Sequence, residues 1–278
     1  MVLHLDNSFN PFPEQNTIAF QSFTFSGGEP HIKIDPDFNT AETVTITHRL
    51  NSFDAIGMVC LAVDALRRMG VQSIEGFFPY FPAARQDRVM IAGEPLSVKV
   101  NATILNALQL NKITIFDSHS EVAPALLDNC EALTNHIFIQ KVLEEISQDT
   151  LLVAPDGGAL KKIYKVSQFL GGKEVIECSK KRDVKSGKLS GFKVYSDDLK
   201  GHNCLIVDDI CDGGGTFLGL AEELKKNNAG KLYLAISHGI FNKGFDTLNA
   251  VFAKIYTTNS FQDIKEPNVT QMDLKDLI

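Results

Sequence analysis

The sequence predicts an α/β protein of two domains, each built on a mainly parallel β-sheet flanked by helices. Short apolar runs alternate with longer amphipathic stretches from end to end, and this pattern is typical of strand–helix units with right-handed crossovers. The series begins again near residue 136, and 278 residues exceed the usual length of a single domain. We therefore expect an N-terminal domain over residues 1–136 and a C-terminal domain over residues 137–278.

The first domain is expected to alternate three strands with two helices. Residues 43–48, 74–81 and 112–119 are short apolar runs and are predicted as strands. Residues 56–70 and 97–111 space their apolar side chains as one face of a helix requires. The first of these helices ends in basic residues and glycine, as helix C-termini commonly do.

The second domain repeats this alternation. After the segment "NHIFIQKVLEEIS", the series runs through "TLLVAPDGG", "ALKKIYKVSQFLGG", "KEVIECSKKRD", "CLIV" with the helix that follows it, and "KLYLAISHG". The run Cys204 to Val207 is wholly apolar, as expected for a strand buried on both faces of a parallel sheet.

Composition excludes several classes of protein. The hydrophobic content of 44% and charged content of 22% are ordinary for a globular protein. A net charge of -7 argues against nucleic acid as the main partner. The five cysteines lie far apart and suggest buried free thiols in a reducing compartment. No signal sequence or membrane-length apolar run is recognisable, so we expect a cytoplasmic enzyme without membrane partners.

Chemically reactive side chains recur where predicted strands end. Ligands of parallel α/β sheets gather at the carboxyl ends of the strands, and several titratable residues fall there. They are Asp117 and His119, Asp156, Lys180 and Arg182, and the segment from Asp208 to Thr216.

The segment "VDDICDGGGTF" joins a predicted strand to a predicted helix N-terminus. Its three glycines let the backbone turn sharply or approach a ligand closely, and amides at a helix N-terminus favour an anion, commonly phosphate. Asp208 and Asp209 suit hydroxyl groups or a metal ion instead. Together these features suggest a sugar phosphate, whereas the plainer alternative is a tight turn with an aspartate cap.

Four other segments have a functional and a structural interpretation. Two arginines in "ARQDR" could clamp a polyphosphate, or the segment is a solvated loop. His119 could bind a metal or phosphate, or it could have only a structural role. The segment "APDGGALKK" is a second anion loop or a simple turn. The basic run at 179–191 is a surface loop or hairpin, or a loop that closes over a phosphoryl group.

Seven motifs together resemble the ribose-phosphate pyrophosphokinase family, also called phosphoribosyl pyrophosphate synthetase. They are "VDALRR", "PYFPAARQDR", "FDSHSE", "APDGG", "SKKRD", "VDDICDGGGT" and "SHGIF", in the family's order and at similar spacing over about residues 25–245. The resemblance implies two phosphoribosyltransferase-like domains. It also implies Mg²⁺-dependent transfer of the diphosphoryl group of ATP to the C1 hydroxyl of ribose 5-phosphate, releasing AMP.

The resemblance also implies roles for individual residues. The ribose-5-phosphate loop would be formed by Asp208, Asp209, Asp212, Gly213, Gly214, Gly215 and Thr216. Metal ligands would be His119 and Asp156, and the ATP contacts Phe25, Glu29, Arg85, Gln86 and Asp87. Lys180, Arg182 and His119 would be catalytic. A homo-oligomer, a dimer or a hexamer, is expected, because a neighbouring subunit often lends the adenine contacts in this family.

The chain departs from the family pattern in places, and these departures leave alternatives. Gly213 replaces a residue whose hydroxyl normally holds the 5-phosphate, so a 5-substituted ribose such as ADP-ribose is an alternative acceptor. Gly27 stands where an aspartate is usual, and the first family strand and long helix are not recognisable. A phosphoribosyltransferase is a second alternative, although "ARQDR" and "SKKRD" favour the kinase. A non-catalytic regulatory homologue is the third.

Overall fold

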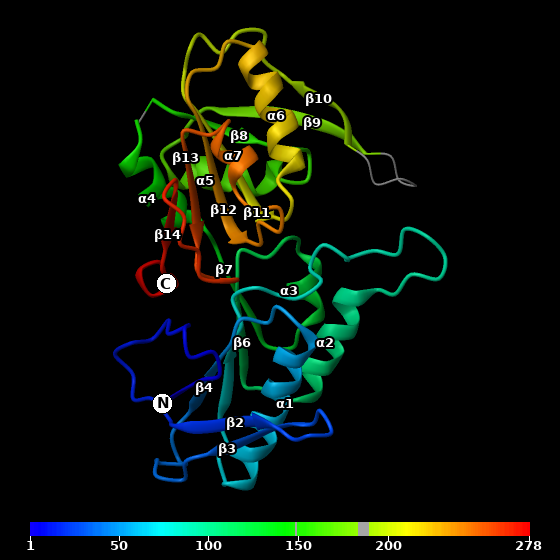
Figure 1. The fold of residues 1–278 in the computed structure, drawn as a ribbon, viewed down its shortest axis with the longest axis vertical. Helices are drawn as coiled ribbons and strands as arrows, with labels where there is room; N and C mark the ends of the chain where they lie inside the picture. The colour runs from blue at the N-terminus through cyan, green and yellow to red at the C-terminus, as the bar shows by residue number, and fades with distance from the viewer. Residues whose placement is uncertain (148, 183–188) are drawn as a thin grey trace. The chain divides into compact units, whose positions relative to one another are not determined.

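The computed structural model describes residues 1–147, 149–182 and 189–278, and it divides into two compact units. Unit 1 comprises Met1–Thr134 with Leu274–Asp276 and Ile278, and unit 2 comprises Asn135–Asp273 with Leu277. Figure 1 labels most of the helices and strands of each unit. No helix in the described ranges combines the length and the apolar character needed to cross a bilayer.

Unit 1 contains a five-stranded sheet in the order β1-β4-β5-β6-β7, with every neighbouring pair parallel. Its strands are β1 (Val2–His4), β4 (Val44–Thr47), β5 (Ile74–Phe77), β6 (Lys112–Phe116) and β7 (Cys130–Leu133). Its helices are α1 (Phe53–Arg68), α2 (Ser97–Ala107) and α3 (Val122–Leu126). The antiparallel hairpin of β2 (Phe20–Thr24) and β3 (Pro30–Ile34) packs on α1.

Helix α1 illustrates how the sequence determines these elements. The Ser52 side chain accepts a hydrogen bond from the backbone N–H of Ala55 and caps the start of the helix. The last turn carries two arginines, whose positive charges interact favourably with the negative end of the helix dipole. Its apolar face contributes Val59, Val63 and Leu66 to the core of unit 1.

Unit 2 contains a seven-stranded sheet in the order β10-β9-β8-β11-β12-β13-β14, parallel except for the β9–β10 pair. Its strands are β8 (Leu151–Ala154), β9 (Val175–Arg182), β10 (Leu189–Val194), β11 (Cys204–Cys211), β12 (Leu232–Gly239), β13 (Lys254–Thr258) and β14 (Val269–Met272). Its helices are α4 (His136–Glu145), α5 (Leu160–Phe169), α6 (Gly215–Lys226) and α7 (Asp246–Asn249). A 3₁₀ turn, η1 (Leu274–Asp276), follows β14.

The structure confirms the predicted fold class and corrects several boundaries. Strand β11 continues to Cys211, so Asp208 and Asp209 are strand residues and not loop residues. Lys180 likewise lies inside β9, which extends to Arg182. The N-terminal residues do form a strand, β1, although its three residues are too few for the pattern to be recognised.

Candidate active site

The glycine loop of unit 2 joins β11 to α6, as the sequence predicts. Gly214 is the N-cap of α6 and has a left-handed backbone with φ of 75°, a conformation that glycine adopts without the steric cost of a Cβ. Thr216 lies in the first turn of the helix, and the N-cap residue, a glycine, has no side chain with which to cap that turn. The first amides of α6 therefore receive no cap from the N-cap residue, and amides at a helix N-terminus favour an anion.

Asp208 and Asp209 lie at the carboxyl end of β11, immediately before this loop. Asp209 is 6% exposed, and its backbone N–H donates to the Asp208 carboxylate at 3.0 Å. Burial, reinforced by the neighbouring carboxylates of Asp209 and Asp156, raises the pKa of Asp208 well above its ordinary value, and Lys180 offsets only part of this effect. The site thus concentrates negative charge that a bound cation or hydroxyl donors would relieve.

Asp156 follows β8 and forms an ion pair with Lys180 of β9. Lys180 Nζ lies 2.5 Å from Asp156 Oδ2, while the backbone N–H groups of Gly158 and Ala159 donate to Asp156 Oδ1 at 2.8 and 3.1 Å. Burial alone would raise the pKa of Asp156, but Lys180 and these two amides outweigh it and lower the pKa. The structure therefore brings Asp156, Lys180 and Asp208 into one electrostatic cluster in unit 2.

In unit 1 the loops after β5 and β6 bring Asp87 and His119 together. Ser120 Oγ donates to Asp87 at 2.9 Å, and Arg88 Nε lies 3.1 Å from the same carboxylate. Burial would raise the pKa of Asp87, but the bonds from Ser120 and Arg88, together with the charges of Arg88 and His119, hold it below its ordinary value. Arg85 and Gln86 are exposed beside it. Sequence reasoning did not assign Ser120 a role.

Phe25 and Glu29 occupy the tip of the β2–β3 hairpin. The Phe25 N–H donates to the Glu29 carbonyl at 2.9 Å, and the Phe25 ring is 51% exposed, with its centroid 4.9 Å from that of Phe23. Within unit 1, the hairpin lies at the opposite end from α3, the helix that follows β6 (Figure 1). An exposed aromatic pair at this position suits a stacking surface for a planar ring.

Two predicted features fall wholly or partly outside what the structure describes. Arg182 is the last residue of β9, and the structure does not describe its side chain. The centre of the basic run, residues 183–188, lies outside the described residues. Its flanks pair antiparallel as β9 and β10.

The carboxylate oxygens at the carboxyl ends of the strands of unit 2 suit a hard cation whose remaining ligands come from a substrate and from water. Among the described residues, no three His, Cys, Asp or Glu side chains converge as a metal site. Mg²⁺ commonly takes only one or two protein carboxylates and completes its octahedron with phosphate oxygens and water. The crowded carboxylates of Asp156 and Asp208 fit that mode.

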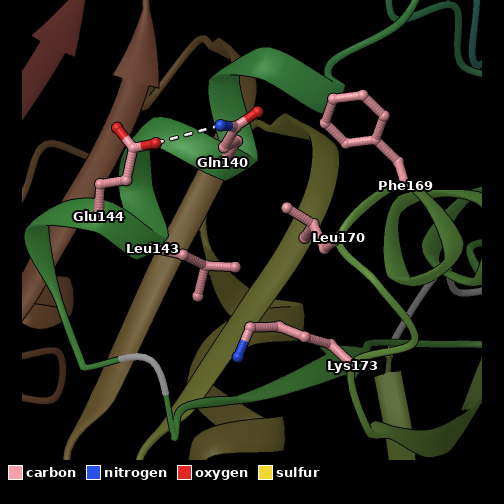
Figure 2. Close-up of a pocket in the computed structure, with 6 residues that line it drawn as sticks. All are labelled: Gln140, Leu143, Glu144, Phe169, Leu170 and Lys173. Atoms are coloured by element: carbon pink, nitrogen blue, oxygen red, sulfur yellow. Dashed lines mark hydrogen bonds between the residues drawn. The ribbon is translucent and has the colours of Figure 1, made fainter.

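A separate cavity in unit 2 lies between α4 and α5 and has a volume of about 300 Å³ (Figure 2). A hydrogen bond from Gln140 Nε2 to Glu144 Oε1, 3.1 Å long, lies on its rim. Its lining contains none of the site residues predicted from the sequence. The lining residues are Gln140, Leu143, Glu144, Phe169, Leu170 and Lys173.

Known proteins match both units. Residues 123–272 match the phosphoribosyl transferase domain family, and residues 14–108 match the N-terminal domain of ribose phosphate pyrophosphokinase. A ribose-phosphate pyrophosphokinase of Mycoplasma genitalium is 30% identical over 265 residues, which cover 91% of this chain and 78% of the relative. One from Thermococcus kodakarensis is 33% identical over 228 residues, which cover 79% and 77% of the two chains.

A solved structure with a similar fold is the phosphoribosylpyrophosphate synthetase of Mycobacterium smegmatis. The TM-score is 0.83 at 22% identity, and the match covers 100% of this chain and 95% of that one. Fold and sequence together define an α/β protein with two phosphoribosyltransferase-like domains. More particularly, the chain belongs to the ribose-phosphate pyrophosphokinase family.

Proposed function

We propose that this protein is a ribose-phosphate diphosphokinase, which transfers the β,γ-diphosphoryl group of ATP to the C1 hydroxyl of ribose 5-phosphate. The products are phosphoribosyl pyrophosphate and AMP. The observation that carries the proposal is the arrangement at the end of β11, where two carboxylates precede a helix N-terminus that begins with a left-handed glycine. Carboxylates suit sugar hydroxyls and the amides suit a phosphate, so both ends of one ribose phosphate are matched.

Unit 2 is proposed to hold the sugar. Asp208 and Asp209 would accept hydrogen bonds from its ring hydroxyls, and the backbone from Asp212 to Thr216 would bind the 5-phosphate. Lys180 would neutralise charge that develops on the transferred group. Arg182 is proposed for the same task.

Unit 1 is proposed to hold the nucleotide. Arg85, Gln86 and Asp87 would bind the ATP phosphates and ribose, and Phe25 would stack on the adenine with Glu29 beside it. Because the hairpin that carries Phe25 lies at the opposite end of unit 1 from the helix after β6, we propose that it serves the site of a second copy in a homo-oligomer. The proposed domains are residues 1–136 on the ATP side and residues 137–278 on the sugar side.

The proposed reaction needs no covalent intermediate with the protein. The C1 hydroxyl oxygen attacks the β-phosphorus of ATP in line and forms a C1–O–P bond. The bond from the β-phosphorus to the oxygen that bridges the α-phosphorus breaks, its electron pair leaves with AMP, and the hydroxyl proton passes to solvent. The protein contributes orientation and electrostatic stabilisation, the main requirements of phosphoryl transfer.

Mg²⁺ is the proposed cofactor, with His119 and Asp156 as its protein ligands. When bound, it would neutralise the ATP phosphates and polarise the β-phosphorus. In unit 2 the Lys180 ammonium pairs with the Asp156 carboxylate, so a cation bound to Asp156 would compete with Lys180 for that carboxylate. We further propose that the enzyme works in the cytoplasm.

A second acceptor is favoured by one observation. Gly213 brings no side-chain hydroxyl to the loop to hold a terminal 5-phosphate, so a ribose whose 5-phosphate carries a further substituent, such as ADP-ribose, is a candidate for the same chemistry. The reacting C1 hydroxyl is unchanged in that compound. The two acceptors differ only at the other end of the sugar.

Product analysis tests the proposed reaction with each of the two acceptors. The purified protein is incubated with Mg²⁺, ATP and either ribose 5-phosphate or ADP-ribose, and AMP and the sugar product are measured by mass spectrometry. We expect one AMP for each acceptor that gains one diphosphoryl unit, and no reaction when Mg²⁺ is chelated. Release of ADP, or of AMP without acceptor, would contradict the proposal.

A further inference from the structure

The segment that follows β12 lies over the glycine loop. The backbone N–H of Asn242 donates to the Asp212 carbonyl at 3.0 Å, and the N–H groups of Ile240 and Phe241 donate to the Cys211 carbonyl at 3.0 and 3.1 Å. These bonds fix residues 240–242 against the turn that begins the proposed phosphate loop. The neighbouring residue, Lys243, is thereby held close to the loop as well.

Because Gly213 has no side chain, the Lys243 side chain can approach the loop closely. A Cβ at position 213 would lie 3.3 Å from Cδ and Cε of Lys243 and 3.3 Å from Oδ1 of Asn242, closer than most real Cβ contacts. The Lys243 ammonium is one bond beyond Cε, so it lies within about 5 Å of that Cβ position. A larger residue at 213 would push the Lys243 stem away from the loop.

The loop carries no cationic side chain of its own. Between residues 208 and 216 the chain carries three carboxylates and neither lysine nor arginine. The N-terminus of α6 offers only about half an elementary charge. Lys243 is exposed, and in the described part of the chain no carboxylate forms an ion pair with it.

We propose that Lys243 binds the phosphoryl group on C5 of the acceptor sugar and makes the site specific for phosphorylated ribose. This inference rests on the proposed function and adds a binding residue to it. An ammonium that donates to a phosphate oxygen forms a charge-assisted hydrogen bond, roughly twice as strong as a neutral one. The same contact serves a terminal 5-phosphate and the first phosphate of a 5-diphosphate substituent, because both place an anionic phosphoryl group on C5.

Substitution of Lys243 by Gln tests the inference. Lys243→Gln keeps the length of the side chain and removes its charge. We expect KM for ribose 5-phosphate to rise about tenfold, while kcat and KM for ATP stay within about twofold. With ADP-ribose as acceptor, a similar rise in KM would support a shared contact with the phosphoryl group on C5, and an unchanged KM would contradict that shared contact.

A matched control is Lys225→Gln, which removes the same charge from an exposed residue in the last turn of α6, about 15 Å along the helix from the loop. We expect this variant to keep the wild-type KM. Lys243→Arg should retain most of the affinity, because it keeps a cation. Equal KM values for ribose 5-phosphate in wild type and Lys243→Gln would overturn the inference.

Binding of inorganic phosphate separates this inference from the proposed function. If wild-type protein makes no AMP with either acceptor, the proposed reaction is wrong, yet Lys243 can still be tested by calorimetric titration with phosphate. Weaker phosphate binding by Lys243→Gln than by Lys225→Gln would support the lysine's role. Identical phosphate affinity in the two variants would refute it.

Discussion

At the scale of single residues, ionisation of Asp208 opposes folding, and we propose that the same carboxylate binds the acceptor sugar. The folded-state pKa of Asp208 lies above the ordinary value of 3.8, because desolvation and the neighbouring carboxylates of Asp209 and Asp156 oppose its ionisation. Ionisation of Asp208 is therefore more costly in the folded chain than in the unfolded one. Its contribution to stability falls as pH rises from about 3.8 through the folded-state pKa.

Asp208→Asn removes the charge while keeping the shape of the side chain. We expect the variant to melt about 2–4 °C higher than wild type at pH 7 without Mg²⁺, because carboxylate repulsion is relieved. Activity should fall about a hundredfold, because a group that binds the sugar hydroxyls is weakened. Calorimetry and the AMP assay check the two effects.

A control for this substitution is Asp197→Asn, which changes the same charge at an exposed residue of unit 2. It should alter neither melting temperature nor activity. If Asp208→Asn melted lower than wild type, Asp208 would be a stabilising partner and its proposed role in relieving charge through a ligand would be wrong.

The sequence was informative about residues with distinctive chemistry and silent about those placed by the fold. Asp156, Lys180 and Asp208 were predicted as candidate site residues because each falls at or just after the end of a predicted strand. Lys243 follows a different strand, and its approach to the loop depends on hydrogen bonds to Cys211 and Asp212. Ser120 likewise meets Asp87 only through the fold of unit 1.

At the scale of elements, the β11–α6 connection depends on a left-handed glycine. A Cβ on Gly214 would lie 3.0 Å from Leu248 Cδ2, and φ is 75°. Gly57, in the interior of α1, has no atom within 4 Å of the corresponding Cβ position and no left-handed backbone. The two glycines therefore respond oppositely to the same substitution.

Gly214→Ala should destabilise the protein by about 1–2 kcal/mol, because an alanine in the left-handed region is strained, and it should weaken acceptor binding. Gly57→Ala should stabilise it by about 0.5–1 kcal/mol, because alanine is the better helix former, with activity unchanged. Urea unfolding measures both. A stabilised Gly214→Ala variant would show that the loop does not need this backbone geometry.

Strands with an apolar pattern were predictable, and those without one were not. Strands β5, β6, β8 and β12 are mostly buried, so their composition marks them. By contrast, β2 is largely exposed, and β7 and β14 are only partly buried. Such strands are held mainly by backbone hydrogen bonds to a neighbour, and these leave little trace in residue type.

At the scale of the whole molecule, the chain consists of two units of the same α/β construction, and we propose a different substrate for each. The alternation of strands and helices could be predicted, because buried parallel strands and amphipathic helices have different hydrophobic periods. The inclusion of Leu274–Asp276 in unit 1 could not, because it depends on tertiary packing of a short turn. The assignment of nucleotide to unit 1 and sugar to unit 2 follows from the residues that each unit carries.

The central claim is that the acceptor's C1 oxygen attacks the β-phosphorus of ATP, and an isotope experiment tests it most directly. Ribose 5-phosphate labelled with ¹⁸O at C1 is converted with Mg²⁺ and unlabelled ATP, and both products are analysed by mass spectrometry. We predict that the diphosphorylated sugar retains the ¹⁸O in the bond between C1 and phosphorus and that AMP carries none. Loss of the label from the sugar product, or its appearance in AMP, would contradict this account.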